Sequence, residues 1–130
     1  MSGQVHEDHS LLLEVWKDYS DGIYAGDVGK LERIFHPSSS MFYNGDEGIV
    51  AVPIKEYLSM VANRPAPERT GASRREKLVS IAMPSPDNAV LTATILISGK
   101  SFTDQLVLLK QSGRWLIVAK TYHLDSVAEA

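Results

Sequence analysis

The stretch that decides the fold is Phe102–Leu124, which reads FTDQLVLLKQSGRWLIVAKTYHL. Two apolar runs rich in β-branched residues flank the polar break Lys110–Gly113. This pattern is typical of a β-hairpin, in which a glycine-containing turn joins two strands. At a period of two, Asp104 falls on the same face as the apolar Leu106 and Leu108. A carboxylate on an apolar strand face is costly unless it is paired or protonated, so either that face is wet or Asp104 has a function.

Three amphipathic helices are predicted upstream of this hairpin. The first is expected at about His6–Tyr24, where apolar side chains recur at helical spacing, and Gly26 is its expected C-terminal stop. Asp27 has the side chain of an N-cap for a second helix over 28–35. Pro53 suits the first position of a third helix, which we expect to end near Asn63.

The remaining strands come in two groups. Short strands are predicted at 41–43 and 49–52, behind a Ser38–Ser40 linker, and longer ones at 78–83 and 89–98. Helices followed by a run of strands indicate an α+β layer fold, whose last four strands form a curved meander. Both faces of that sheet carry apolar side chains, so each face needs a cover. The helices cover one face, and a second copy of the protein is the simplest cover for the other.

Composition limits the class of protein. The 130 residues fit a single domain, 1–130, and 44% of them are hydrophobic, which is enough for a core. The net charge of -3 argues against electrostatic binding to nucleic acid or membranes. The chain has no cysteine, which excludes disulfides and thiolate chemistry. A polar N-terminus unlike a signal peptide and the lack of a membrane-length apolar run predict a cytoplasmic protein.

Two segments carry a family resemblance: VWKDYSDGIYAGDVGKLERIFHPSS (15–39) and FTDQLVLLKQSGRWLIVAKTY (102–122). In these segments and in element order, the chain resembles the nuclear transport factor 2-like superfamily, including its SnoaL-like members. More narrowly, it resembles the putative lumazine-binding family. The resemblance implies a cone-shaped, cystatin-like barrel in which three helices fold against a curved, mostly antiparallel sheet around a pocket. It also implies a homodimer packed through the sheets.

Ketosteroid isomerase, of the same superfamily, uses a Tyr and a protonated Asp as an oxyanion hole. The resemblance matches Tyr19, seven residues before Gly26, to that Tyr, and Asp104, early in the penultimate strand, to that Asp. The general base of the isomerase is an Asp on the first strand after the helices, where this chain has Tyr43. A Tyr is a poor base at neutral pH because its reference pKa is about 10. The resemblance therefore implies the donor pair without the isomerase base.

Asp104 and Tyr19 are the leading candidates for a catalytic or ligand-binding pair, and the alternative is a purely structural hydrogen bond between them. His123, late in the last strand, is predicted to reach the mouth of the pocket as a base. Five aromatic residues are candidates for lining a pocket for a flat ligand, although aromatics at such spacing more often form core. They are Trp16, Phe35, Tyr43, Tyr57 and Phe102.

Other chemistry finds little support. No histidine pair has the spacing of metal ligands, and the chain has no Gly-rich phosphate loop and no nucleophile elbow, so neither a metal nor a cofactor is predicted. Basic residues cluster around the polar loop 64–73, where they are able to bind an anion; because acidic residues interrupt them, a solvated loop is favoured. The basic residues are Arg64, Arg69, Arg74, Arg75 and Lys77. Lys120 faces either an interface or the pocket, which strand parity leaves open.

Three functions are compatible with these patterns. The first is non-catalytic binding of a flat, mostly apolar molecule whose single carbonyl meets Tyr19 and Asp104. The second is an isomerase, dehydratase or cyclase with an enolate-like intermediate, in which His123, Tyr43 or Asp104 itself moves the proton. The third is a dimeric interaction module, which a pocket filled by its own side chains would favour. In each case we expect a sheet-to-sheet homodimer with Val107 near its centre.

Overall fold

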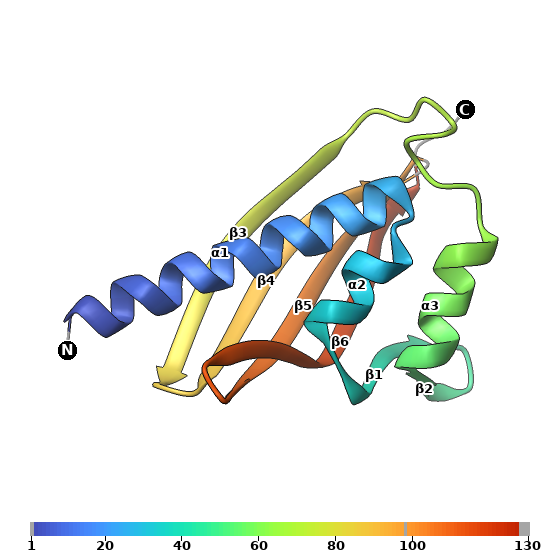
Figure 1. The fold of residues 1–130 in the computed structure, drawn as a ribbon. Coiled ribbons are helices and arrows are strands. Elements are labelled where there is room, and N and C mark those ends of the chain that lie inside the picture. The colour runs from blue at the N-terminus through green and yellow to red at the C-terminus, as the bar shows by residue number, and fades with distance from the viewer. Residues whose placement is uncertain (1, 98, 128–130) are drawn as a thin grey trace.

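The computed structural model describes residues 2–97 and 99–127 (Figure 1). The helices are α1 (Ser2–Ala25), α2 (Val28–Ile34) and α3 (Ile54–Asn63). The strands are β1 (Phe35–Gly45), β2 (Gly48–Pro53), β3 (Arg75–Ser85), β4 (Asn88–Ile97), β5 (Lys100–Gln111) and β6 (Arg114–Val127). None of the helices in the described ranges has the length and apolarity needed to span a bilayer.

The strands form one sheet in the order β2-β1-β6-β5-β4-β3. Every neighbouring pair is antiparallel except β1 and β6, which run parallel. The predicted meander of the last four strands is confirmed. The parallel pairing brings the strand that follows α2 beside the last strand of the chain, so both halves of the sequence contribute to one layer.

The helices all lie on one face of the sheet, and α1 runs diagonally across it (Figure 1). Side chains on that face are buried, and those on the opposite face of β4 are only half-buried. Seven large hydrophobic side chains are fully buried between the two layers, and each burial contributes about 1.5–3 kcal/mol. They are Tyr19, Leu12, Leu31, Leu91, Leu106, Leu108 and Ile117. The predicted α+β class, with helices packed on a mostly antiparallel sheet, is confirmed.

The turn between α1 and α2 follows the predicted chemistry. Gly26 has a φ of +66°, in the left-handed region that glycine adopts without strain, and it ends α1. The carboxylate of Asp27 then accepts a hydrogen bond from the backbone N–H of Lys30 at 3.1 Å, as an N-cap does. This reversal folds α2 back against α1.

Several predicted boundaries are wrong; α1, for example, begins at Ser2 and not near His6. Ser38–Ser40 is not a linker but the middle of β1, because its backbone pairs with neighbouring strands: Ser40 lies opposite Ala119 of β6 and Pro53 of β2. Phe35 begins β1 and does not extend α2. Pro53 is the N-cap of α3, and the helix itself begins one residue later.

A β-bulge in β6 decides which side chains of that strand face the helices. Val107 of β5 pairs with Ala119, but the next residue of β5 pairs with Ile117, so Val118 is an extra residue. As a result Ile117 and Lys120, three residues apart, are both buried toward the helices. The bulge turns His123 to the opposite face.

Candidate functional site

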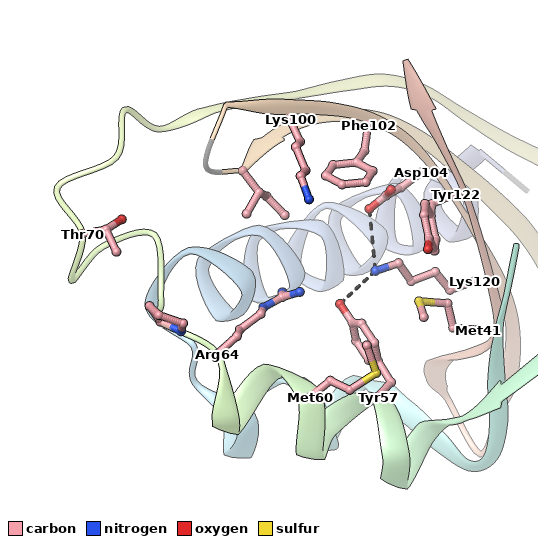
Figure 2. Close-up of a pocket in the computed structure, with 12 residues that line it drawn as sticks. Met41, Tyr57, Met60, Arg64, Thr70, Lys100, Phe102, Asp104, Lys120 and Tyr122 are labelled. Carbon is pink, nitrogen blue, oxygen red and sulfur yellow. Dashed lines mark hydrogen bonds and ion pairs between the residues drawn. The ribbon is translucent and has the colours of Figure 1, made fainter. Parts of the chain in front are cut away.

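A cavity of about 380 Å³ lies between α3, the loop that follows it, and strands β1, β4, β5 and β6 (Figure 2). Its walls are largely apolar, with a few polar and charged groups that converge on the interior. The lining residues are Met41, Tyr57, Met60, Arg64, Pro65, Thr70, Ile97, Lys100, Phe102, Asp104, Lys120 and Tyr122.

Asp104 is 4% exposed and lies on the wall formed by β5. The hydroxyl of Tyr19, on α1, donates a hydrogen bond to Asp104 Oδ2 at 2.5 Å across 85 residues of sequence. Tyr19 itself is completely buried and does not line the cavity. Burial, together with the negative charge of Asp104, raises the pKa of Tyr19 well above 10. Tyr19 therefore stays protonated, and its hydrogen bond reaches Asp104 from outside the cavity.

Lys120 is the second buried charge in the cavity wall. Its Nζ donates to the hydroxyl of Tyr57 at 2.8 Å and lies 3.9 Å from Asp104 Oδ2 (Figure 2). It also lies over the Tyr57 ring, 4.3 Å from the centroid, which favours a cation. Burial lowers the pKa of Lys120, but Tyr57 and Asp104 raise it by more, so that the net pKa is raised. Lys120 therefore remains an ammonium ion with Asp104 as its counter-charge.

The predicted aromatic residues divide into a lining and a supporting set. Tyr57 and Phe102 line the cavity. Phe35 stands behind it, between the rings of Tyr19 and Tyr57, with centroid distances of 6.3 and 6.2 Å. Trp16 packs against Tyr19 at 6.1 Å. The supporting set is part of the hydrophobic core, and it fixes the positions of the side chains that do reach the cavity.

Tyr43 and His123 are both candidate proton carriers from their sequence positions. Tyr43 packs against the ring of Tyr122 at a centroid distance of 5.3 Å and is outside the cavity lining. His123 has a side chain that is 78% exposed, and its Nδ1 lies 2.8 Å from Asp125 on the outer face of the sheet. The prediction that His123 reaches the pocket mouth is therefore wrong, because the bulge in β6 reverses its orientation.

Sequence reasoning missed Arg64, which it assigned to a solvated loop. Arg64 is the C-cap of α3, and its guanidinium points into the cavity (Figure 2). The sequence does contain a signal for Arg64. Its spacing from Tyr57 and Met60, at i, i+3 and i+7, places the three residues on one face of a helix. The cavity also contains Lys100, which no sequence pattern distinguished. Among residues 2–97 and 99–127, no three His, Asp or Glu side chains gather in a way that suits a metal ion.

Comparison with models of protein families assigns the chain to one family. It matches the family of putative lumazine-binding proteins over residues 7–123, and it therefore belongs to this family. The family resemblance noted in the sequence is confirmed. No protein of curated function matches the chain.

Solved structures show that the fold is nuclear transport factor 2-like. A protein of unknown function from Silicibacter pomeroyi DSS-3 with this fold has a TM-score of 0.81 and 23% identity, covering 92% of this chain and 98% of that one. Another, from Shewanella baltica OS155, has a TM-score of 0.79 and 26% identity over 94% and 96%. A structure from Novosphingobium aromaticivorans DSM 12444, described as a putative scytalone dehydratase, has a TM-score of 0.69 and 14% identity over 100% and 92%.

Proposed function

We propose that the protein binds a small organic molecule in the cavity beside α3 and does so without catalysis. The observation that carries this proposal is the cavity itself. Its volume of about 380 Å³ falls in the range of small-molecule sites, about 300–1,000 Å³. Largely apolar walls with a few convergent polar groups are also typical of such sites. Membership of a family named for lumazine binding supports a small-molecule ligand.

The polar contacts available to a ligand differ from those of an oxyanion hole. Tyr19 donates its hydroxyl proton to Asp104 and is shielded from the cavity, so it is not available to a ligand carbonyl. A carbonyl oxygen in the cavity would meet the ammonium of Lys120 and the hydroxyl of Tyr57. We therefore assign the recognition of a ligand carbonyl to Lys120 and Tyr57, with Asp104 holding Lys120 in place.

A thermal-shift screen of pterins, flavins and aromatic ketones tests this proposal. A ligand at 100 times its dissociation constant should stabilise the protein by about 2.7 kcal/mol. Met60→Trp places a large ring at the half-exposed wall of the cavity and should abolish the shift. Ser59→Trp adds the same ring to an exposed site on α3 outside the cavity and should leave it intact. The proposal fails if no compound stabilises the wild-type protein, or if Met60→Trp responds like Ser59→Trp.

A lyase or isomerase with an enolate-like intermediate is a second candidate. The observation that favours it is a buried carboxylate and a buried ammonium facing one cavity, at 3.9 Å from each other. Asp104 would remove a proton next to a substrate carbonyl, and Lys120 would stabilise the developing enolate oxygen. Deuterium exchange at the α-carbon of an aromatic ketone, followed by NMR, tests this role. Exchange that persists in Asp104→Asn at the wild-type rate would exclude Asp104 as the base.

We further propose a homodimer that forms through the outer face of the sheet. Val107 lies on this face in register with Val90 and Ala119, and Leu109 beyond it is 42% exposed. The next row of side chains on this face is polar, so the face is mixed. Val107→Glu should shift sedimentation toward monomer, because a like-charge pair across a two-fold axis is costly. Wild-type protein that sediments as a monomer at micromolar concentration would contradict this assembly.

A further inference from the structure

The guanidinium of Arg64 carries a buried hydrogen-bond donor that the described residues leave unpaired. Its Nη2 atom is fully buried and has no hydrogen-bond partner among residues 2–97 and 99–127. Two arginines elsewhere in the protein find acceptors: Arg74 contacts Asp21 and Glu76, and Arg114 donates to the carbonyl of Arg33 at 3.0 Å. Buried donors in native proteins are almost always paired, so an unpaired one needs an explanation.

The cavity wall as a whole also carries more positive than negative charge. Three cationic side chains line it, Arg64, Lys100 and Lys120, against the single carboxylate of Asp104. Asp104 already serves Lys120 and accepts the hydrogen bond from Tyr19. Neither Arg64 nor Lys100 has a salt bridge to a carboxylate within the described ranges. Positive charge is therefore left over in the cavity wall, on Arg64 and on the more exposed Lys100 (Figure 2).

We propose that the ligand of this cavity is an organic carboxylate whose head group binds Arg64, an inference that rests on the proposed function. A guanidinium presents two parallel N–H donors that match the two oxygens of a carboxylate. Because Nη2 is closed to solvent without a ligand, binding turns the Arg64 side chain so that Nη2 also meets the carboxylate and its charge is neutralised. Lys100 lines the same cavity and adds a second positive charge. The apolar body of the ligand then packs against Met41, Ile97 and Phe102.

The position of Arg64 at the end of α3 explains how the head group of the ligand is selected. Arg64 ends the helix and is followed by Pro65, whose ring fixes the backbone and has no N–H of its own. The backbone N–H of Arg64 bonds to the carbonyl of Met60 at 3.1 Å, which holds the residue against the last turn. The side chain thus starts from a fixed point and reaches into the cavity. A guanidinium held at a fixed position in this way discriminates between ionised and neutral ligands.

A matched pair of probes tests the inference by isothermal titration calorimetry: 2-naphthoate, which is a carboxylate, and 2-naphthamide, which is its neutral counterpart. The wild-type protein should bind 2-naphthoate at least about tenfold more tightly, as expected of a charge-assisted hydrogen bond. Arg64→Gln should remove this preference while binding 2-naphthamide within about twofold of wild type. Arg69→Gln, an exposed substitution in the same loop outside the cavity, should keep it.

A ligand-free measurement provides an independent check. Arg64→Met replaces the unpaired guanidinium with an apolar side chain of similar length, so the melting temperature of the empty protein should rise above that of the wild type. Arg69→Met should leave it unchanged. A melting temperature lowered by Arg64→Met would mean that the protein itself satisfies Arg64, and it would overturn the inference.

The inference and the proposed function fail in different ways. If both naphthalene probes bind equally, or neither binds, a carboxylate is not what the cavity selects and the inference is overturned. The proposed function is judged by the neutral compounds of the thermal-shift screen and by Met60→Trp. It survives an overturned inference whenever one of those compounds binds in the cavity.

Discussion

Two buried carboxylates in this protein lie in contrasting surroundings. Asp8, on α1, is 1% exposed and has a complete set of partners. Lys110 lies 2.8 Å from it, and the indole N–H of Trp115 donates to it at 3.1 Å. Gln4 donates a further hydrogen bond at 3.2 Å. The hydrogen bond from Lys110 lowers the pKa of Asp8 in spite of its burial.

Asp104 has a similar set of partners with one difference. A lysine, Lys120, supplies the opposite charge, and the hydroxyl of an aromatic residue, Tyr19, supplies a hydrogen bond. Here, however, the cluster faces a cavity that also contains the unpaired guanidinium of Arg64. The Asp8 cluster (Asp8, Lys110 and Trp115) joins α1 to the β5–β6 hairpin. The Asp104 cluster (Asp104, Lys120 and Tyr19) borders a cavity with room for another molecule.

The difference teaches that a buried charge by itself does not identify a functional site. Both carboxylates are paired, so pairing does not separate structural from functional groups. What separates them is the space beside the charge and the polar groups that the protein leaves unsatisfied there. Substitutions in the two clusters should therefore have different effects on stability and on ligand binding.

The largest effect is expected for Asp104→Leu. The substitution leaves Lys120 buried without its counter-charge, which should cost about 3–5 kcal/mol in the free energy of unfolding. Urea unfolding at neutral pH measures this cost. Adding Lys120→Met should restore most of the loss, because it removes the stranded charge. A loss below about 1 kcal/mol from Asp104→Leu would show that the two charges are not coupled.

Tyr19→Phe should have a smaller effect. It removes a buried hydrogen bond to a charged group, for a loss of about 1.5–3 kcal/mol at neutral pH. Because folding raises the pKa of Tyr19, its contribution is complete below the unfolded value of about 10 and falls as the pH rises above that value. The unfolding free energy of wild type should therefore decline more steeply in alkali than that of Tyr19→Phe. Ligand affinity should barely change, and a large change would mean that Tyr19 touches the ligand.

The smallest effect is expected for Asp8→Asn, since the amide keeps the shape of the side chain. Folding lowers the pKa of Asp8, so its contribution is present above the unfolded value of about 3.9 and is lost as the pH falls through the lower folded value. Acid titration of the unfolding free energy should show a shallower decline in Asp8→Asn than in wild type below about pH 4. Identical profiles would contradict this assignment, and ligand binding should be unchanged.

Sequence patterns predicted the elements that depend on local rules. The turn at Gly26 and Asp27 and the alternation that turns Asp104 inward follow from capping and from strand parity. Ser38–Ser40 was misjudged because its strand conformation comes from parallel pairing with β6, a contact that no local pattern reveals.

The candidate site was only partly predictable for the same reason. Lys120 and His123 change faces through one extra residue, Val118, and bulges have no reliable signature in a single sequence. Arg64 was hidden by its polar neighbours, although its helical spacing from Tyr57 placed it on the cavity side of α3. The empty volume itself depends on how three helices pack on a curved sheet, which residue types alone do not determine.

The central claim, that the cavity beside Asp104 is the binding site, is tested most directly by an NMR titration of the amide and indole resonances with 2-naphthoate. The account predicts shifts that centre on Lys100, Phe102 and Lys120. The indole N–H of Trp115, which reports on the Asp8 cluster, should stay in place. Shifts that centre on Trp115, or on the outer face around Val107, would contradict the account.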